Sequence, residues 1–334
     1  MQTFTPYQYS QIAVANKLGQ DKKNWDARLE FASGFLSETH EEQIKYALAK
    51  SEEPMLACKA INAHRDAING VESGFMIDLD CTASGIQLLS VLTGCKESAR
   101  KVNLINTGKR EDIYNYMVNT MASFNCHTTR DIMKDPVMTT FYGSTEQPKL
   151  VFGEDTPELN AYYKTLQKEL PGCWNALQTI QPLWNDKWER YGWELPDGHV
   201  VDIPVMSVKD FKIEIAEFFK RTFTFRTTVN AAKEYSRELT ANVTHSVDGY
   251  VVREMIRMAH GQGWKLATIH DSFWCHPNYT NQMRRNFNVI LSKLAESDLL
   301  TSILRSLTGN HTASYRKFSD DLHLDILDAN YALS

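Results

Sequence analysis

Phe75–Gln87, with the sequence FMIDLDCTASGIQ, is the stretch from which the fold of this chain is best predicted. Its first six residues form a short apolar run that ends in Asp80, and such a run is typical of a buried strand. From residue 85 to 94, apolar residues recur at helical spacing before a closing glycine, so we expect an amphipathic helix there. Either Thr82 or Ser84 is expected to cap this helix. The sequence therefore predicts a strand, a turn and a helix, with the Asp80 carboxylate at the strand exit.

A second pattern lies in Arg130–Ser144, with the sequence RDIMKDPVMTTFYGS. Four of its side chains stand four residues apart, so on a helix they form one stripe. The stripe consists of Arg130, Lys134, Met138 and Tyr142. Two cations followed by an apolar and an aromatic side chain suit a nucleoside triphosphate, whose phosphates need cations and whose sugar and base need a surface. Pro136 lies within the stripe and could kink or restart the helix.

The third pattern is Ile269–Phe273, IHDSF, within a segment that predicts a strand, a tight turn and a second strand. Two aspartates at the ends of separate strands can meet when the strands are neighbours. Asp80 and Asp271 could then hold two divalent ions for phosphoryl transfer. Taken singly, each pattern also has an ordinary explanation as a turn residue, a solvated helix face or a chance match. Their order and spacing together favour the catalytic interpretation.

The composition is that of an ordinary globular chain with a sizeable core. Of its 334 residues, 43% are hydrophobic and 23% charged, which excludes low-complexity and collagen-like classes. No apolar run is long enough to predict a membrane-spanning helix, and the N-terminal sequence has no secretory-signal pattern. The six cysteines form no CxxC pair, which argues against a zinc ribbon. The net charge of −5, taken alone, counts against a nucleic-acid-binding protein.

The remaining segments predict a mostly helical chain with one β-hairpin. Helices are expected over much of residues 5–62, over 111–122, from about Val247 to His260 and near 278–297. Two β-like runs, 213–218 and 222–229, flank Phe219-Lys220-Arg221 and predict a hairpin with a basic tip. Trp184 and Trp188 are expected to share one helix face and to pack in the core.

Taken together, these motifs resemble those of the single-subunit, phage-type and mitochondrial RNA polymerases, the T-seven-like family. Residues 80–87 look like motif A of that family, residues 130–144 like motif B and residues 269–273 like motif C. Shorter matches are Gly19-x-Asp21-Lys22, Trp25-xx-Arg28, Val102-Asn103-Leu104, Asp112-Ile113-Tyr114, His245-Ser246-x-Asp248-Gly249 and the C-terminal LHLDILDANYALS. The resemblance therefore covers essentially the whole chain.

The resemblance implies an α+β, mostly helical fold with the right-hand architecture of polymerases. Residues 1–96 and 245–334 would form a palm, centred on a small antiparallel sheet that carries Asp80 and Asp271. Residues 97–244 would form the fingers. The N-terminal domain and the thumb of the family would be lacking.

The hairpin over 212–229 lies where the family keeps its promoter-specificity loop. Its basic residues Lys220, Arg221 and Arg226 would contact template or promoter. An exposed basic hairpin with no sequence-specific role remains an equal alternative.

Family members are much longer, and the matching region here begins near Met1, so the chain looks like a complete catalytic half. This arrangement is similar to the split, two-chain RNA polymerase of N-four-like phages, of which this chain would be the motif-bearing subunit. The implied partners are a second subunit that supplies the N-terminal and thumb regions, DNA template, RNA product and ribonucleotides. Without promoter recognition of its own, the enzyme would need a single-stranded-DNA-binding loading factor. Much of the basic surface would lie on the second subunit, and the location would be the cytoplasm of the infected bacterial host.

The resemblance also implies roles for single residues. Asp80 and Asp271 would be the catalytic carboxylates and would bind two Mg²⁺ ions. Arg130 and Lys134 would hold the incoming triphosphate, and Lys134 would donate a proton to the departing pyrophosphate. The other implied substrate-binding residues are Gly85, Met138, Tyr142, Gly143 and His245, with Tyr142 also catalytic. Asp78, on the same strand face as Asp80, would add negative charge near the metals or have a structural role.

Two positions favour ribonucleotides. Related family A DNA polymerases carry a glutamate where this chain has Gly85, and that side chain obstructs a ribose 2′-hydroxyl, whereas glycine leaves the space open. Those enzymes also have an acid where this chain has Ser272. Tyr142 and His245 would help to recognise the 2′-hydroxyl and the minor-groove edge. Without the resemblance, a core tyrosine ahead of a helix-ending Gly143 would be preferred.

Three alternatives stay open at the level of sequence. The chain could be a non-catalytic assembly subunit. The presence of every expected metal- and triphosphate-binding residue argues against this alternative. It could be a DNA polymerase of the family A type, against which Gly85 and Ser272 argue. It could be a metal-dependent phosphohydrolase that uses His270 and Asp271, but no further ligands stand at helical spacing.

Overall fold

The computed structural model describes residues 1–334 as a mostly helical chain with short antiparallel strands. The long helices are α1 (Pro6–Ala15), α2 (Trp25–Phe35), α3 (His40–Lys50), α4 (Pro54–Ile68), α5 (Ser84–Thr93), α6 (Lys96–Lys101), α7 (Ile113–Ser123), α8 (Arg130–Thr140), α9 (Glu146–Phe152), α10 (Pro157–Glu169), α11 (Pro171–Ile180), α12 (Glu238–Gly261), α13 (Thr280–Glu296), α14 (Leu299–Thr308) and α15 (Leu322–Leu327). The strands are β1 (Ile77–Asp80), β2 (Arg190–Glu194), β3 (Val200–Pro204), β4 (Met206–Ile215), β5 (Arg221–Asn230), β6 (Leu266–Ile269) and β7 (Ser272–Cys275). Four short elements are η1 (Asn16–Gln20), in which the chain kinks, and the single turns η2 (Gln181–Leu183), η3 (Ala216–Phe218) and η4 (Pro277–Tyr279). The expected mostly helical α+β class is confirmed.

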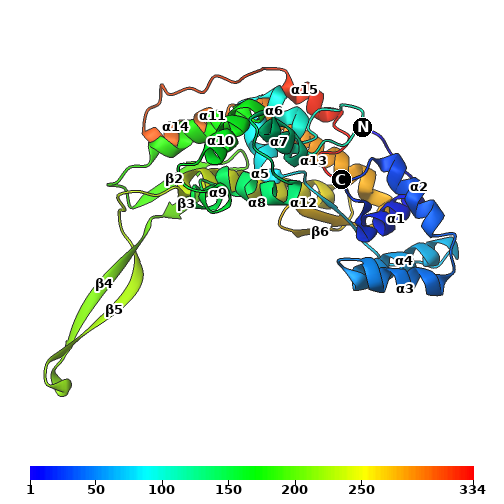
Figure 1. Cartoon of the computed structure of the whole chain (residues 1–334), viewed down its shortest axis with the longest axis horizontal. Coiled ribbons are helices and arrows are strands. Elements are labelled where there is room, and N and C mark those ends of the chain that lie inside the picture. The colour runs from blue at the N-terminus through cyan, green and yellow to red at the C-terminus, as the bar shows by residue number, and fades with distance from the viewer.

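These elements form an arch (Figure 1). The body of the arch holds α5–α15, the lobe of α1–α4 lies at one end, and β4 and β5 extend from the other end as a free ribbon. One large hydrophobic core runs through the body and into the N-terminal lobe. Helix α5 lies at its centre and is buried over Gly85–Thr93, so the turn before α5 is held firmly.

The three-stranded sheet joins distant parts of the chain in the order β1-β7-β6, all antiparallel. In β1, Ile77 and Leu79 are buried, so Asp78 and Asp80 share the opposite face. Asp80 pairs with Ser272, the first residue of β7. The sheet thus confirms the strand predictions around Asp80 and Asp271.

The turn between β1 and α5 differs from the expectation in its cap. The N-cap residue of α5 is Ala83, with a left-handed φ of 54°, and neither Thr82 nor Ser84 caps the helix. Buried Thr82 instead donates a hydrogen bond to the Tyr331 carbonyl at 3.1 Å. The residues near the C-terminus pair along this turn, through a bridge between Cys81 and Leu333. The Thr82 hydroxyl therefore makes a tertiary hydrogen bond and does not cap the helix.

Helix α8 carries Arg130, Lys134 and Met138 of the predicted stripe without a break, although Pro136 lies inside it, whereas Tyr142 lies in the turn just after the helix. The hydroxyl of Thr129 caps its first turn by accepting from the Ile132 amide. The Thr140 hydroxyl donates to the Pro136 carbonyl at 2.8 Å and so satisfies an acceptor near the end of the helix. Gly143, with φ of 93°, turns the chain away just after Tyr142.

The helix expected to hold Trp184 and Trp188 is not present. Pro182 ends α11 in the short turn η2, and the chain then enters the hairpin of β2 and β3. The rings of both tryptophans instead lie against Tyr191, at 4.9 and 5.4 Å between centroids. Both tryptophans pack against the core as expected. Their spacing of four residues, however, spans a turn and not a helix.

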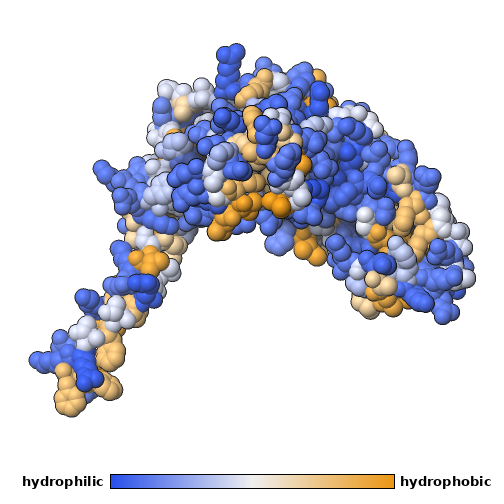
Figure 2. All heavy atoms as spheres, in the orientation of Figure 1, coloured by the Kyte–Doolittle hydropathy of each residue, from blue (hydrophilic) through white to orange (hydrophobic).

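The free ribbon is longer than the predicted hairpin. Its strands pair over Met206–Asn230, and the tip lies at 216–220, ahead of Arg221. On one face, Phe211 stacks on Phe225 at 5.4 Å between ring centroids, and Ile213 pairs with Phe223. These side chains are half exposed, and Phe219 at the tip is 93% exposed. Apolar side chains along the ribbon are visible in the space-filling view (Figure 2).

Candidate active site

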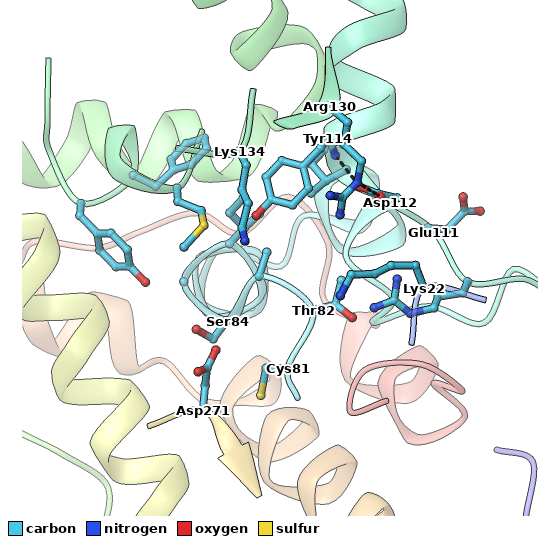
Figure 3. Close-up of a pocket in the computed structure, with 18 residues that line it drawn as sticks. Lys22, Cys81, Thr82, Ser84, Glu111, Asp112, Tyr114, Arg130, Lys134 and Asp271 are labelled. Carbon is cyan, nitrogen blue, oxygen red and sulfur yellow. Dashed lines mark hydrogen bonds and ion pairs between the residues drawn. The ribbon is translucent and has the colours of Figure 1, made fainter. Parts of the chain in front are cut away.

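A cavity of about 230 Å³ lies between the first turn of α5, the stripe of α8 and the segment 110–114 (Figure 3). The expected site residues that line it are Gly85, Arg130, Lys134, Met138, Tyr142 and Asp271. Lys134 and Asp271 point into the cavity from opposite sides, with Ser84 between them (Figure 3). Lys134 forms no ion pair with any acid. One wall of the cavity therefore offers an unpaired cation and the opposite wall offers a carboxylate.

Arg130 is held in place by two neighbours. Its Nε donates to Asp112 Oδ2 at 2.6 Å, and its guanidinium lies 5.3 Å from the centre of the Tyr114 ring. Asp112 also accepts from the Tyr114 amide and so caps α7. Because the start of α7 fixes Asp112, Arg130 is oriented before any ligand arrives.

The two expected metal ligands lie at neighbouring strand ends. Asp80 ends β1, Asp271 lies in the turn before β7, and the Cys81 amide donates to the Asp271 carbonyl at 3.3 Å. Asp271 lines the cavity, whereas Asp80 is exposed and is not among the residues that line it. Partial burial raises the pKa of Asp80, and the charges of Asp78 and Asp271 add to this effect, while a hydrogen bond from Ser272 opposes it. The three carboxylates therefore repel one another, and Lys17, which pairs with Asp78, offsets only part of this repulsion at Asp80.

A third carboxylate, Asp248 of α12, belongs to the same group. Partial burial raises the pKa of Asp248 to about 6, and the charge of Asp271 adds to the increase. No three acidic, histidine or cysteine side chains form a preassembled metal cage. Asp271 in a cation-lined cavity, with Asp80 at the neighbouring strand end, still fits Mg²⁺, which is usually bound by one or two carboxylates together with substrate phosphates and water.

Tyr142 fills the space beside Gly85. A Cβ atom at position 85 would lie 2.7 Å from the Tyr142 hydroxyl. The Tyr142 ring also packs on His245 of α12, at 4.8 Å between centroids. Burial raises the pKa of Tyr142, and the charge of Asp248 contributes. The space that the missing side chain of Gly85 leaves is therefore occupied by the Tyr142 hydroxyl and is not open.

Gly143 is not brought to the cavity. It lines a separate hollow next to α11, and any side chain there would clash with the Arg237 carbonyl. Its role in this structure is to turn the chain. His245 reaches the site only through its contact with Tyr142.

Sequence reasoning missed several residues of the cavity. Lys22 and Arg110 line it beside Arg130 and Lys134. Lys22 and Asp248 each lie in one of the short segments that resemble the family. The sequence therefore contained a signal that could have identified both residues. Arg110 lies in no such segment, and only the fold brings it to the cavity.

Comparison with known families agrees with this geometry. Residues 5–148 and 193–327 match the profile of the family described as DNA-dependent RNA polymerase. The chain belongs to this family of phage-type RNA polymerases. The polymerase is accordingly a nucleotidyltransferase, and its family generally uses Mg²⁺, a DNA template and nucleoside triphosphates.

Both β1 and the segment with β6 and β7 lie in the matched residues, as do α8 and the free ribbon of the polymerase. A comparison with curated proteins finds no match. None of the helices is both long and apolar enough to span a membrane.

Proposed function

We propose that this chain is the catalytic subunit of a DNA-directed RNA polymerase and adds nucleoside monophosphates to the 3′ end of RNA. The observation that carries the proposal is a single cavity with four cations on its walls and Asp271 on the opposite side. The four cations are Lys22, Arg110, Arg130 and Lys134. A triphosphate needs such a concentration of positive charge beside its reacting phosphorus.

In this proposal, the cations orient the triphosphate. Arg130, fixed by Asp112, offers its remaining guanidinium donors to phosphate oxygens. Lys134 has no partner of its own, so its ammonium is free to bind the phosphates and to protonate the departing pyrophosphate. Lys22 and Arg110 add further positive charge to the lining of the cavity.

Asp80 and Asp271 would hold the Mg²⁺ ions. Such ions, when bound, activate the 3′-hydroxyl and stabilise charge on the leaving pyrophosphate. Partial burial, and after it the charges of Asp78 and Asp271, raise the pKa of Asp80, and a divalent cation beside these carboxylates would relieve the repulsion among them.

Tyr142 would select ribose. Its hydroxyl lies against the backbone of Gly85, and its ring is supported by His245. A side chain at position 85 would displace Tyr142 from this place. Selection would then depend on the pair Gly85 and Tyr142, rather than on glycine alone.

We further propose a palm made of residues 1–96 and 245–334 and fingers made of 97–244. The sheet β1-β7-β6 supports this division, because it joins the first and last segments, while α8 comes from the middle one. The ribbon of β4 and β5 would contact promoter or template. A second polypeptide, which supplies the N-terminal and thumb regions, would complete the enzyme.

Primer extension tests the proposal. An RNA primer annealed to a DNA template is incubated with Mg²⁺ and ribonucleotides, with the chain alone and with the chain co-expressed with its neighbouring genes. Extension in either sample supports a polymerase, and extension only after co-expression supports a split enzyme. A folded chain that extends no primer in either sample would favour a non-catalytic assembly subunit. Faster incorporation of deoxyribonucleotides would favour a DNA polymerase.

A further inference from the structure

One ion pair outside the cavity joins two elements, η1 and β1, that directly precede the cavity-lining residues Lys22 and Cys81 in the chain. The Nζ atom of Lys17, in η1, lies 2.7 Å from Asp78 Oδ2 on β1 and 2.7 Å from Glu53 Oε2. The side chains of Lys17 and Asp78 are only 11% and 17% exposed, so this pair is largely shielded from solvent. Its ammonium also lies 5.6 Å from the centre of the Trp274 ring on β7. Lys17 thus binds two neighbouring strands of the sheet at once.

The segment that carries Lys17 has an unusual backbone. At η1 the chain kinks between two helices, because Leu18 and Gly19 leave helical geometry and Gly19 has a left-handed φ of 79°. The fully buried guanidinium of Arg28 holds this segment from the other side. Its three donors reach Asn16 Oδ1 at 3.0 Å, the Asp21 carbonyl at 2.7 Å and the Lys23 carbonyl at 2.9 Å. Lys22 extends from the same segment to the cavity.

Asp78 is equally well placed on the sheet. It stands two residues before Asp80 on the same face of β1 and pairs with Trp274 in the register of β7. The contact between Lys17 and Asp78 therefore links the backbone that presents Lys22 to the strand that presents Asp80.

We propose that Lys17 is a positioning residue, whose ion pair with Asp78 fixes the distance between the phosphate-binding Lys22 and the carboxylate Asp80. The inference rests on the proposed polymerase function and deepens it. Phosphoryl transfer needs the triphosphate and the carboxylates in register, and a misplacement of about 1 Å can cost about a hundredfold in rate.

The chain offers a matched set of variants. Lys17→Met and Asp78→Ala each break the tie between the two elements. Glu53→Gln removes the other partner of the same ammonium, but Glu53 is half exposed and lies outside the sheet. Lys17→Arg keeps a cation at this position.

Two measurements on the full chain separate positioning from general support. The first is equilibrium binding of α,β-methylene-ATP with Mg²⁺, followed by calorimetry, and the second is KM and kcat for ribonucleotides in primer extension. We expect Lys17→Met and Asp78→Ala each to weaken binding and raise KM by about tenfold, the size of one lost well-aligned contact. The double variant should be no worse than either single one, and Glu53→Gln and Lys17→Arg should resemble the wild type.

Lys17→Met removes a positive charge near Asp80, and Asp78→Ala removes a negative one. An effect of charge alone would therefore have opposite signs in the two variants, and opposite effects would overturn the proposal. Nucleotide binding and KM unchanged in both variants would also overturn it. If Lys17→Met fails to fold, Asp78→Ala alone decides, since it leaves the pair with Glu53 in place. If the wild-type chain never extends a primer, alone or co-expressed, the proposed polymerase function is contradicted. The comparison of nucleotide binding between the wild type and the variants still tests the positioning role of Lys17 in that case.

Discussion

At the residue scale, the contact of Gly85 with Tyr142 restricts substitution at the wall of the cavity. We expect Gly85→Ala to push the Tyr142 hydroxyl aside, because the added Cβ atom would lie 2.7 Å from it. The preference for ribonucleotides over deoxyribonucleotides, measured as a ratio of kcat/KM, should fall by about tenfold, as expected for one lost hydrogen bond. Gly34→Ala in α2 is the control, since a Cβ atom there meets nothing within 4 Å. An unchanged ratio in Gly85→Ala would remove Tyr142 from the selection of ribose.

Lys134 is the cation whose chemistry can be tested most cleanly. It lines the cavity and is bound to no acid, so its loss leaves no buried charge unpaired. Lys134→Met should lower kcat by about 10²- to 10⁴-fold if the ammonium protonates pyrophosphate. Lys45→Met, on the exposed face of α3, should leave kcat unchanged. A normal kcat with a raised KM would restrict Lys134 to binding.

At the element scale, the hairpin of β2 and β3 is tied to α12 by a buried carboxylate. Asp197, in the hairpin turn, is 1% exposed and accepts from Arg253 at 2.6 and 3.2 Å. The hydrogen bonds from Arg253 lower the pKa of Asp197 to about 2. Because this pKa lies below the value of about 3.9 for an unfolded chain, the stabilisation is complete above about pH 4 and is lost as pH falls toward 2.

Unfolding by urea at several pH values measures this contribution. Asp197→Asn should lower the free energy of unfolding at neutral pH by about 1.5–3 kcal/mol and should flatten its decline below about pH 4. Asp202→Asn breaks the exposed pair with Arg190 and should cost less than about 1 kcal/mol. Equal effects of the two substitutions would contradict the structural role given to Asp197.

The free ribbon should be dispensable for folding. Its strands pair with one another, and most of its side chains are exposed, so little packing is lost with it. Replacing residues 208–228 by a short glycine-containing turn should leave the midpoint of thermal unfolding and the extension of a preformed primer unchanged. Initiation at a promoter should be lost if the ribbon reads DNA. A large fall in the midpoint would show that the ribbon packs on the body in solution.

The elements with a strong local signal could be predicted from the sequence. An apolar run closed by an acid gave β1, and the glycine at residue 94, with φ of 65°, ended α5 as expected. The start of α12 was placed too late, because its stripe continues upstream through Val243 and Leu239 among threonines and polar residues. The spacing of Trp184 and Trp188 imitated a helix, but the backbone of Trp184 is extended and ends the helical conformation there.

The site could be predicted only in part, because only some of its residues belong to local sequence patterns. The stripe of α8 and the two strand-end aspartates are local patterns, so their order along the chain identified them. Lys22 and Arg110 reach the cavity through the packing of separate segments, which no periodicity encodes. The contact between Lys17 and Asp78 likewise joins residues that are distant in sequence.

At the scale of the whole molecule, the arch leaves apolar surface uncovered at both ends (Figure 2). At the end of the N-terminal lobe, the exposed apolar side chains include Leu48, Met55, Ile68 and Val71. At the other end are those of the ribbon, including Phe218, Phe219 and Phe223. Patches of this kind are typical of interaction surfaces. Such patches would suit the second polypeptide proposed above.

The central claim is that the carboxylates of Asp80 and Asp271, together with the cavity, form the centre for RNA synthesis. The most direct test is extension of an RNA primer on a DNA template by the co-expressed wild type, Asp80→Asn and Asp271→Asn. Our account predicts extension by the wild type and none by either variant, with thermal unfolding and nucleotide binding retained in both. Robust extension by either folded variant would contradict it.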